Sequence, residues 1–231
     1  MKLTFITLLT FGLFACNSSA DRRLIDNATV KDHPVPVDKN EINNDEYNCG
    51  FDVFVKDPEI PEIAKDIYLD HEWNLNNDNE ALALLDGLTA KDISLRPFYF
   101  KVVTKSVKKS DGYFSEGLGN AGYNYVLNNT EEFASFFDSR QCHTESDLET
   151  WADIVMLEFG IISEDNYDKP VVGNYIKKLQ SNCNNCSATQ KETINKFSLA
   201  LSERWKGFLQ HTDTQAKKKT KLLTRTETAA F

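Results

Sequence analysis

The sequence predicts an all-α fold, either an antiparallel helical bundle or a short α-solenoid-like stack of helix hairpins. From Phe51 onward, apolar residues recur mainly at steps of three and four, which is the spacing of one helix face. Hydrophobic residues make up 41% of the chain and charged residues 26%, as expected of a chain that buries a core. No convincing internal repeat accompanies the helices, so the solenoid alternative depends on the helix lengths alone.

Three helices are expected in the first half of this domain, over residues 58–73, 80–88 and 95–107. Ser94 is the predicted cap of the third helix, and Pro97 is compatible with its first turn because that turn needs no backbone N–H partner. Phe98 to Val107 is also rich in aromatic and β-branched residues, which favours a strand. The neighbouring helices favour a helix there, and a strand remains the alternative.

Five helices are expected in the second half, over residues 115–127, 130–137, 144–162, 171–179 and 187–209. Thr144-x-x-Asp147 and Ser187-x-x-Gln190 each match a capping box at a helix start. From Thr212 the apolar spacing stops and a basic, Thr-rich segment follows. We therefore expect residues 49–211 to form the helical domain and residues 212–231 to be a disordered tail, with contact to anionic lipid headgroups as its alternative role.

The chain begins with the layout of a secretory signal. Lys2 is followed by an apolar run from Leu3 to Phe14, which is too short to span a bilayer, and then by a small residue. Leu13-Phe14-Ala15-Cys16 resembles the lipobox of bacterial lipoproteins, although Phe14 is bulkier than is usual at its position. The resemblance implies that residues 1–15 are removed and that Cys16 is acylated as the first residue of the mature protein.

Residues 16–48 are predicted to tether the domain to a membrane. They are polar, include Pro34 and Pro36, and show no sustained apolar period. A flexible run of about thirty residues spans roughly 30 Å. Asn17 stands where enterobacterial lipoproteins retained in the inner membrane have an aspartate. By resemblance, this favours an exported protein anchored in the outer membrane and facing the periplasm.

Four cysteines remain once Cys16 is acylated, and an even number in an exported protein predicts two disulfides. They are Cys49, Cys142, Cys183 and Cys186. The helices over 144–162 and 171–179 are expected to be antiparallel, which returns the chain to the end where Cys142 lies. We therefore expect Cys142 to pair with Cys183 or Cys186, and Cys49 to pair with the other. The rival arrangement, Cys183 with Cys186 and Cys49 with Cys142, closes one very small loop and stabilises less through that bond.

The charge balance disfavours nucleic acid as a partner. The formal net charge is −9 and the pI is about 5.0, whereas a phosphate-binding surface needs the opposite sign. Like charges three or four residues apart slightly destabilise a helix, and such a stripe is present near the start of the domain. It is either a solvated face or a docking face for a basic protein, and consists of Glu59, Glu62, Asp66 and Asp70.

Other motifs point to structure more than to chemistry. Residues 117–122 match G-x-G-x-x-G, but no strand or βαβ rhythm surrounds them, so we expect close helix packing and no cofactor. The stretch from Asn74 to Glu80 resembles the first half of a calcium loop but lacks its glycine and closing glutamate. The four histidines are scattered, so no metal site is expected.

Three functions fit these observations. The first is a lipid-anchored, non-catalytic protein-binding module, such as an immunity or inhibitor protein or an envelope assembly partner. The second is a thiol oxidoreductase that uses Cys183 and Cys186, although the helix-to-helix context favours structural disulfides. The third is a purely structural envelope lipoprotein.

Overall fold

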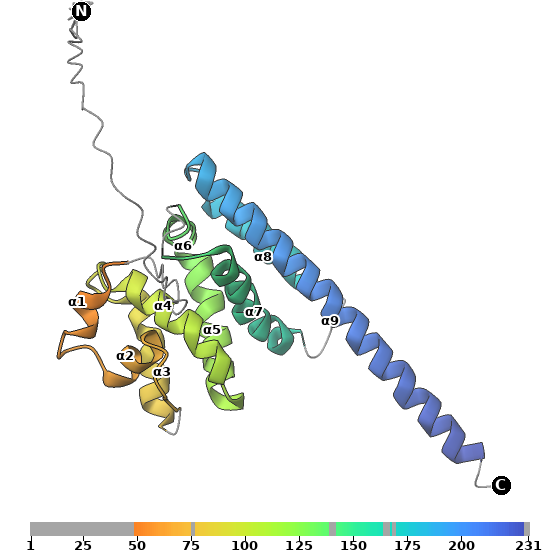
Figure 1. The fold of residues 1–231 in the computed structure, drawn as a ribbon. Helices are drawn as coiled ribbons and strands as arrows, with labels where there is room; N and C mark the ends of the chain where they lie inside the picture. The colour runs from red at the N-terminus through yellow and green to blue at the C-terminus, as the bar shows by residue number, and fades with distance from the viewer. Residues whose placement is uncertain (1–48, 75–76, 139–141, 164–166, 168–169, 229–231) are drawn as a thin grey trace, which may run out of the picture. The chain divides into compact units, whose positions relative to one another are not determined.

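The structure is a computed structural model that describes residues 49–74, 77–138, 142–163, 167 and 170–228. The predicted signal segment, Cys16 and the tether lie outside the described residues. Within them every regular element is helical, which confirms the all-α prediction (Figure 1). The elements are α1 (Asp52–Val55), α2 (Glu62–Tyr68), α3 (Asp78–Asp86), η1 (Gly87–Thr89), α4 (Arg96–Ser106), η2 (Val107–Lys109), α5 (Gly112–Asn128), α6 (Thr130–Ser135), α7 (Glu145–Ile162), α8 (Val171–Asn182) and α9 (Ala188–Thr228).

Local capping chemistry fixes several helix starts as predicted. At α7 the Thr144 hydroxyl accepts from the Asp147 amide at 3.3 Å while the Asp147 carboxylate accepts from the Thr144 amide at 2.7 Å. Ser187 and Gln190 make the same reciprocal pair before α9, at 3.2 and 2.9 Å. The predicted cap at Ser94 is wrong. Its amide and hydroxyl both donate to Asp92, so it closes the turn before α4 instead of capping the helix.

The segment over Phe98–Val107 is helical because α4 buries its aromatic residues between two cores. The larger core joins α4 to α5, α6, α7 and α9, and its centre is Trp151, whose ring stacks on Phe100 with centroids 4.3 Å apart. The Trp151 indole N–H donates to the Thr104 hydroxyl at 2.8 Å. The smaller core packs α1 and α2 on the opposite side of α4 around Phe98.

The glycine motif lies inside α5 and permits close packing, as predicted. A Cβ atom on Gly119 would lie 2.8 Å from the Leu157 Cβ, and one on Gly122 would lie 2.4 Å from an Ile154 methyl group. These contacts place α5 antiparallel to α7 at short range. The motif therefore serves helix packing in α5, and no strand precedes it among the described residues.

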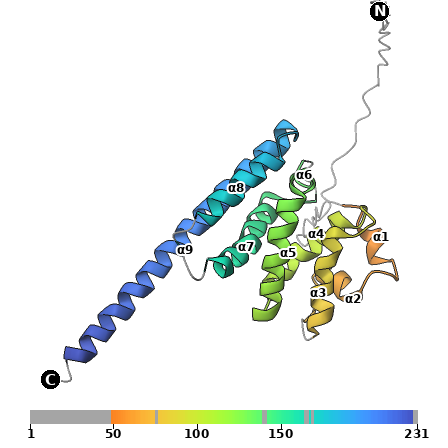
Figure 2. The ribbon, with the colours of Figure 1, turned by 180° about the vertical axis from the view of Figure 1, so that it is seen from behind.

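Helices α7 and α9 pack on each other in parallel, and α8 runs back along α9, behind it in Figure 1 and in front of it in Figure 2. Arg204 of α9 bridges two carboxylates one helical turn apart on α7, those of Glu149 and Asp153. The helix α9 continues to Thr228, which differs from the disordered tail predicted for residues 212–231. No glycine or proline follows Gly207 in the sequence, and lysine is a good helix former, so no residue there ends the helix.

The predicted disulfide pairing is wrong. The structure pairs Cys49 with Cys142, which we call the long-range disulfide, and Cys183 with Cys186, which we call the short-loop disulfide. The chain does return to the end of the bundle near Cys142, since Gln190 donates to Asp138 there. However, Cys183 and Cys186 are the first and last residues of one hydrogen-bonded turn, which holds their Cα atoms 4.9 Å apart. The closure of that turn leaves Cys142 to pair with Cys49.

Candidate functional site

Negative charge is concentrated in residues 49–92, which we call the acidic lobe. This stretch has eleven aspartates and glutamates but only three lysines and no arginine, a formal charge of −8. Residues 93–231 are nearly balanced, with eighteen basic and seventeen acidic residues. None of the eleven acidic residues is buried. The segregation can be counted from the sequence, although no single motif marks it.

The predicted acidic face belongs to this lobe but is not one helix face. Helix α2 covers only 62–68, so Glu59 precedes it and Asp70 follows it with a positive φ of 55°. Three of the four acids have cationic or imidazole neighbours: Glu62 lies 3.4 Å from Lys65, Asp66 lies 3.2 Å from His71, and Asp70 lies 2.6 Å from Lys105. Asp70 therefore helps to hold the lobe on α4.

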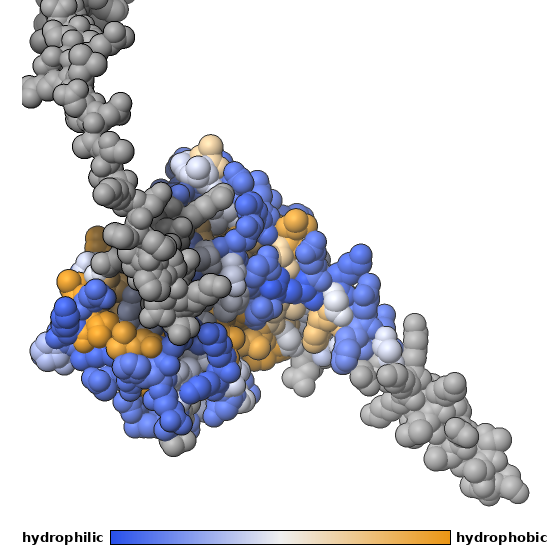
Figure 3. Space-filling model, in the orientation of Figure 1, coloured by the Kyte–Doolittle hydropathy of each residue, from blue (hydrophilic) through white to orange (hydrophobic). Residues whose placement is uncertain are grey.

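Exposed apolar side chains lie among these charges. Val53 is 64% exposed, Leu69 is 42% exposed, and Ile93 directly after the lobe is 70% exposed. On the face shown in Figure 3, apolar residues are scattered between hydrophilic ones over the region of α1 and α2. Single exposed apolar side chains are common on protein surfaces, so the charge of the lobe distinguishes it more than its apolar content does.

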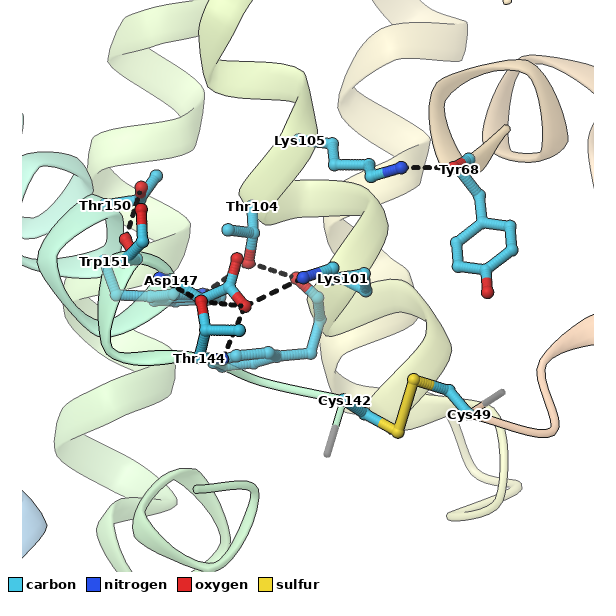
Figure 4. Close-up of polar contacts among 12 residues, drawn as sticks. Cys49, Tyr68, Lys101, Thr104, Lys105, Cys142, Thr144, Asp147, Thr150 and Trp151 are labelled. Atoms are coloured by element: carbon cyan, nitrogen blue, oxygen red, sulfur yellow. Dashed lines mark hydrogen bonds and ion pairs between the residues drawn. A yellow bond between two sulfur atoms is a disulfide. The ribbon is translucent and has the colours of Figure 1, made fainter. Parts of the chain in front are cut away.

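The lobe is attached firmly to the rest of the fold. The long-range disulfide joins its first residue to the loop before α7, and Lys105 of α4 donates to the Tyr68 carbonyl (Figure 4). Behind this contact, Lys101 of α4 pairs with Asp147 of α7 at 2.8 Å, and both side chains are mostly buried. A partner that bound the lobe would therefore bind a surface held in place by covalent and ionic contacts.

His143 is the most unusual polar residue in the structure. It is 3% exposed, and neither ring nitrogen has a hydrogen-bond partner among the described residues. Its ring lies among four phenylalanines, with centroids 4.9 to 6.4 Å away, which are Phe51, Phe100, Phe136 and Phe137. Burial, and secondarily the charge of Lys101, lower the pKa of His143 to about 4. Its neighbour Cys142 is in a disulfide, so no thiol–imidazole pair forms.

Two small pockets lie near residues singled out by the sequence. One, of about 100 Å³, includes His143 in its wall and lies where the first turns of α7 and α9 meet the end of α6. The other, of about 220 Å³, includes Cys183 in its wall together with Lys191 and Asn195 of α9. Both cysteines of the short-loop disulfide are buried, at 2% and 6% exposure.

Comparison with known proteins adds no family. No protein-family model, curated protein or solved structure matches the chain. In the part of the chain that the structure describes, no three or more histidine, cysteine or acidic side chains are grouped to hold a metal ion. No helix in that part has the length and apolar character needed to cross a membrane. The features that bear on function are therefore the acidic lobe, the two pockets and the two disulfides.

Proposed function

We propose that this protein is a lipid-anchored bacterial envelope lipoprotein that works by binding another protein. The observation that carries the proposal is the acidic lobe, which holds nearly all of the net charge on exposed side chains next to exposed apolar residues. The expected partner is a basic protein, because opposite charges raise the association rate and exclude wrong partners. Anchoring through Cys16 in the outer membrane, facing the periplasm, belongs to the same proposal.

A complex between the acidic lobe and a basic protein could serve two roles. An immunity or inhibitor protein would mask a basic surface of a toxin or enzyme, and an envelope assembly factor would hold a basic component in place. Both need a rigid, charged surface and no catalytic group. The long-range disulfide and the Asp70–Lys105 ion pair attach the lobe to the rest of the fold, and the Lys101–Asp147 ion pair joins α4 to α7 behind it.

The test compares two variants with the same loss of charge. The lobe variant neutralises four exposed acids and consists of Glu59→Gln, Glu62→Gln, Glu72→Gln and Asp86→Asn. The control variant neutralises four exposed acids elsewhere and consists of Glu116→Gln, Glu131→Gln, Glu203→Gln and Asp213→Asn. Each full chain is captured from membranes of its native host. We expect one protein to co-purify with the wild type and the control but not with the lobe variant. Equal recovery with all three would argue against the lobe as the binding surface.

A thiol oxidoreductase is the second candidate, and one observation favours it. Cys183 and Cys186 form a disulfide just before α9, and Cys183 borders a pocket that could admit a peptide thiol. In that reaction a substrate dithiol would pass two electrons to the short-loop disulfide, giving a substrate disulfide and two protein thiols. Incubation of the oxidised chain with a reduced dithiol peptide tests it. Formation of the peptide disulfide, lost in Cys183→Ser, would support this activity and count against a purely structural disulfide.

A further inference from the structure

The pocket at the start of α7 and α9 has an apolar wall and an acidic rim. Phe137, Leu148 and the ring of His143 supply the apolar part, and threonines from both helices lie between. The charged side chains around it are the carboxylates of Asp138, Glu145 and Glu192 and the single ammonium of Lys196. Negative charge therefore exceeds positive charge at the pocket.

Lys196 alone does not neutralise the carboxylates around the pocket. Lys196 lies 3.4 Å from Glu145 and 3.7 Å from Glu192, and both carboxylates are well exposed. Ion pairs of that length and exposure are weak, so Lys196 can shift aside. Among the described residues, Asp138 accepts hydrogen bonds from the neutral side chains of Thr189 and Gln190, at 2.8 and 3.1 Å.

An anion fits the pocket less well, although two helix N-termini meet there. At α7 the Thr144 and Asp147 capping box already satisfies backbone amides, and at α9 the Ser187 and Gln190 pair does the same. The three rim carboxylates would repel an anion. The charge at this pocket therefore favours a cation.

His143 supplies an independent sign that the pocket has a ligand. Buried polar groups are nearly always hydrogen-bonded, and an orphaned one in a pocket wall needs an explanation. The neutral imidazole offers one acceptor nitrogen and one donor nitrogen and adds no positive charge that would repel a cation. Its ring also joins the pocket to the acidic lobe, since it lies 6.4 Å from the Phe51 ring.

We propose that this pocket receives the cationic end of a lysine or arginine side chain from the basic partner. Its volume of about 100 Å³ is small enough that it suits the end of one side chain and not a whole folded segment. The alkyl stem would lie on Phe137 and Leu148, and the charged head would lie among the rim carboxylates and donate to the acceptor nitrogen of His143. The proposal rests on the proposed function, because it names one contact of the same partner.

The probe for this site is acetyl-arginine amide, with acetyl-lysine amide as a second cation. Acetyl-citrulline amide has almost the same shape without charge, and inorganic phosphate tests the anion alternative. Amide shifts of the labelled full chain are followed by NMR at low salt. We expect saturable shifts at Thr144, Glu145 and Thr193 with both cations, in the millimolar range suited to a single side chain.

The matched variants are Glu145→Gln with Glu192→Gln, and the control Glu203→Gln on another part of α9. All three residues are exposed, so the fold should be retained. The rim double variant should weaken arginine binding about fivefold or more, while the control should leave it unchanged.

Equal binding of the citrulline and arginine probes, saturation by phosphate alone, or no saturable shift with either cation would each overturn the pocket proposal. None of those results would affect the lobe test, since the pocket variants change no residue of the lobe. A failed capture experiment would likewise leave the arginine titration interpretable.

Discussion

His143 should make the fold sensitive to acid. The folded protein keeps this imidazole neutral down to a pKa of about 4, whereas the unfolded chain takes up a proton near the ordinary value of 6.5. Stability supplied by the neutral ring is therefore present above pH 6.5 and is lost as the pH falls toward 4. Because the pKa differs between the folded and unfolded states, the free energy of unfolding should fall by about 2–3 kcal/mol between pH 7.5 and pH 4.5.

The perturbation that isolates this effect is His143→Leu, which removes the titrating group and keeps a similar volume. Removal of an unsatisfied polar group stabilises the variant, and loss of the aromatic contacts destabilises it. Because the two effects oppose each other, the free energy of unfolding of the variant at pH 7.5 should be within about 1 kcal/mol of the wild-type value. At pH 4.5 the variant should be more stable by about 2–3 kcal/mol. Urea unfolding followed by tryptophan fluorescence at both pH values gives the difference directly.

The control is His71→Gln. His71 has a side chain that is 60% exposed and lies outside the group of phenylalanines around His143, so its replacement should leave the wild-type behaviour at both pH values. If the wild type and His143→Leu lose the same stability on acidification, His143 is not held neutral in the fold. The four phenylalanines around His143 would then not keep its imidazole neutral by excluding water.

Three further predictions follow from the packing, the disulfides and the anchor. Gly119→Ala should destabilise the fold by about 2 kcal/mol because its methyl group would collide with Leu157. Gly160→Ala on α7 has nothing within 4 Å of its new methyl group among the described residues, so it should stabilise the fold by up to about 1 kcal/mol. Thermal unfolding compares the two variants. Replacing both cysteines of the long-range disulfide with alanine should lower the free energy of unfolding by about 4–5 kcal/mol. The same replacement in the short-loop disulfide should lower it by about 2 kcal/mol, because that bond closes a far shorter loop. Denaturant titration measures both changes. Cys16→Ser should move the protein from the membrane fraction to the soluble fraction because durable anchoring needs acyl chains, and a correctly processed but still membrane-bound variant would contradict the lipid anchor.

Local patterns predicted the fold well because the signals involved are short-range. The capping boxes at Thr144 and Ser187 depend on residues three positions apart, and both form as expected. The packing role of the glycines in α5 also follows from their local context. The helix over Phe98–Val107 was ambiguous by composition and is decided by burial on both sides of α4.

Features that depend on distant residues could not be predicted in this way. The disulfide pairing depends on the α6–α7 loop, which brings Cys142 next to Cys49 although the two are 93 residues apart in sequence. The cage around His143 draws phenylalanines from three separate stretches of the chain, so no local motif marks it. The acidic stripe was placed on one helix, but α2 ends at Tyr68 because the chain turns there, and Asp70 points to Lys105 instead.

The most direct test of the central claim is site-specific photo-crosslinking in the envelope of the native host. A photoreactive residue replaces Glu72 in the acidic lobe in one full chain and Glu203 of α9 in another, both exposed. We expect one discrete protein adduct from position 72, lost when the other lobe acids are neutralised, and no such adduct from position 203. An adduct from position 203 alone, or from neither position, would contradict the claim that this protein acts by binding a partner through its acidic lobe.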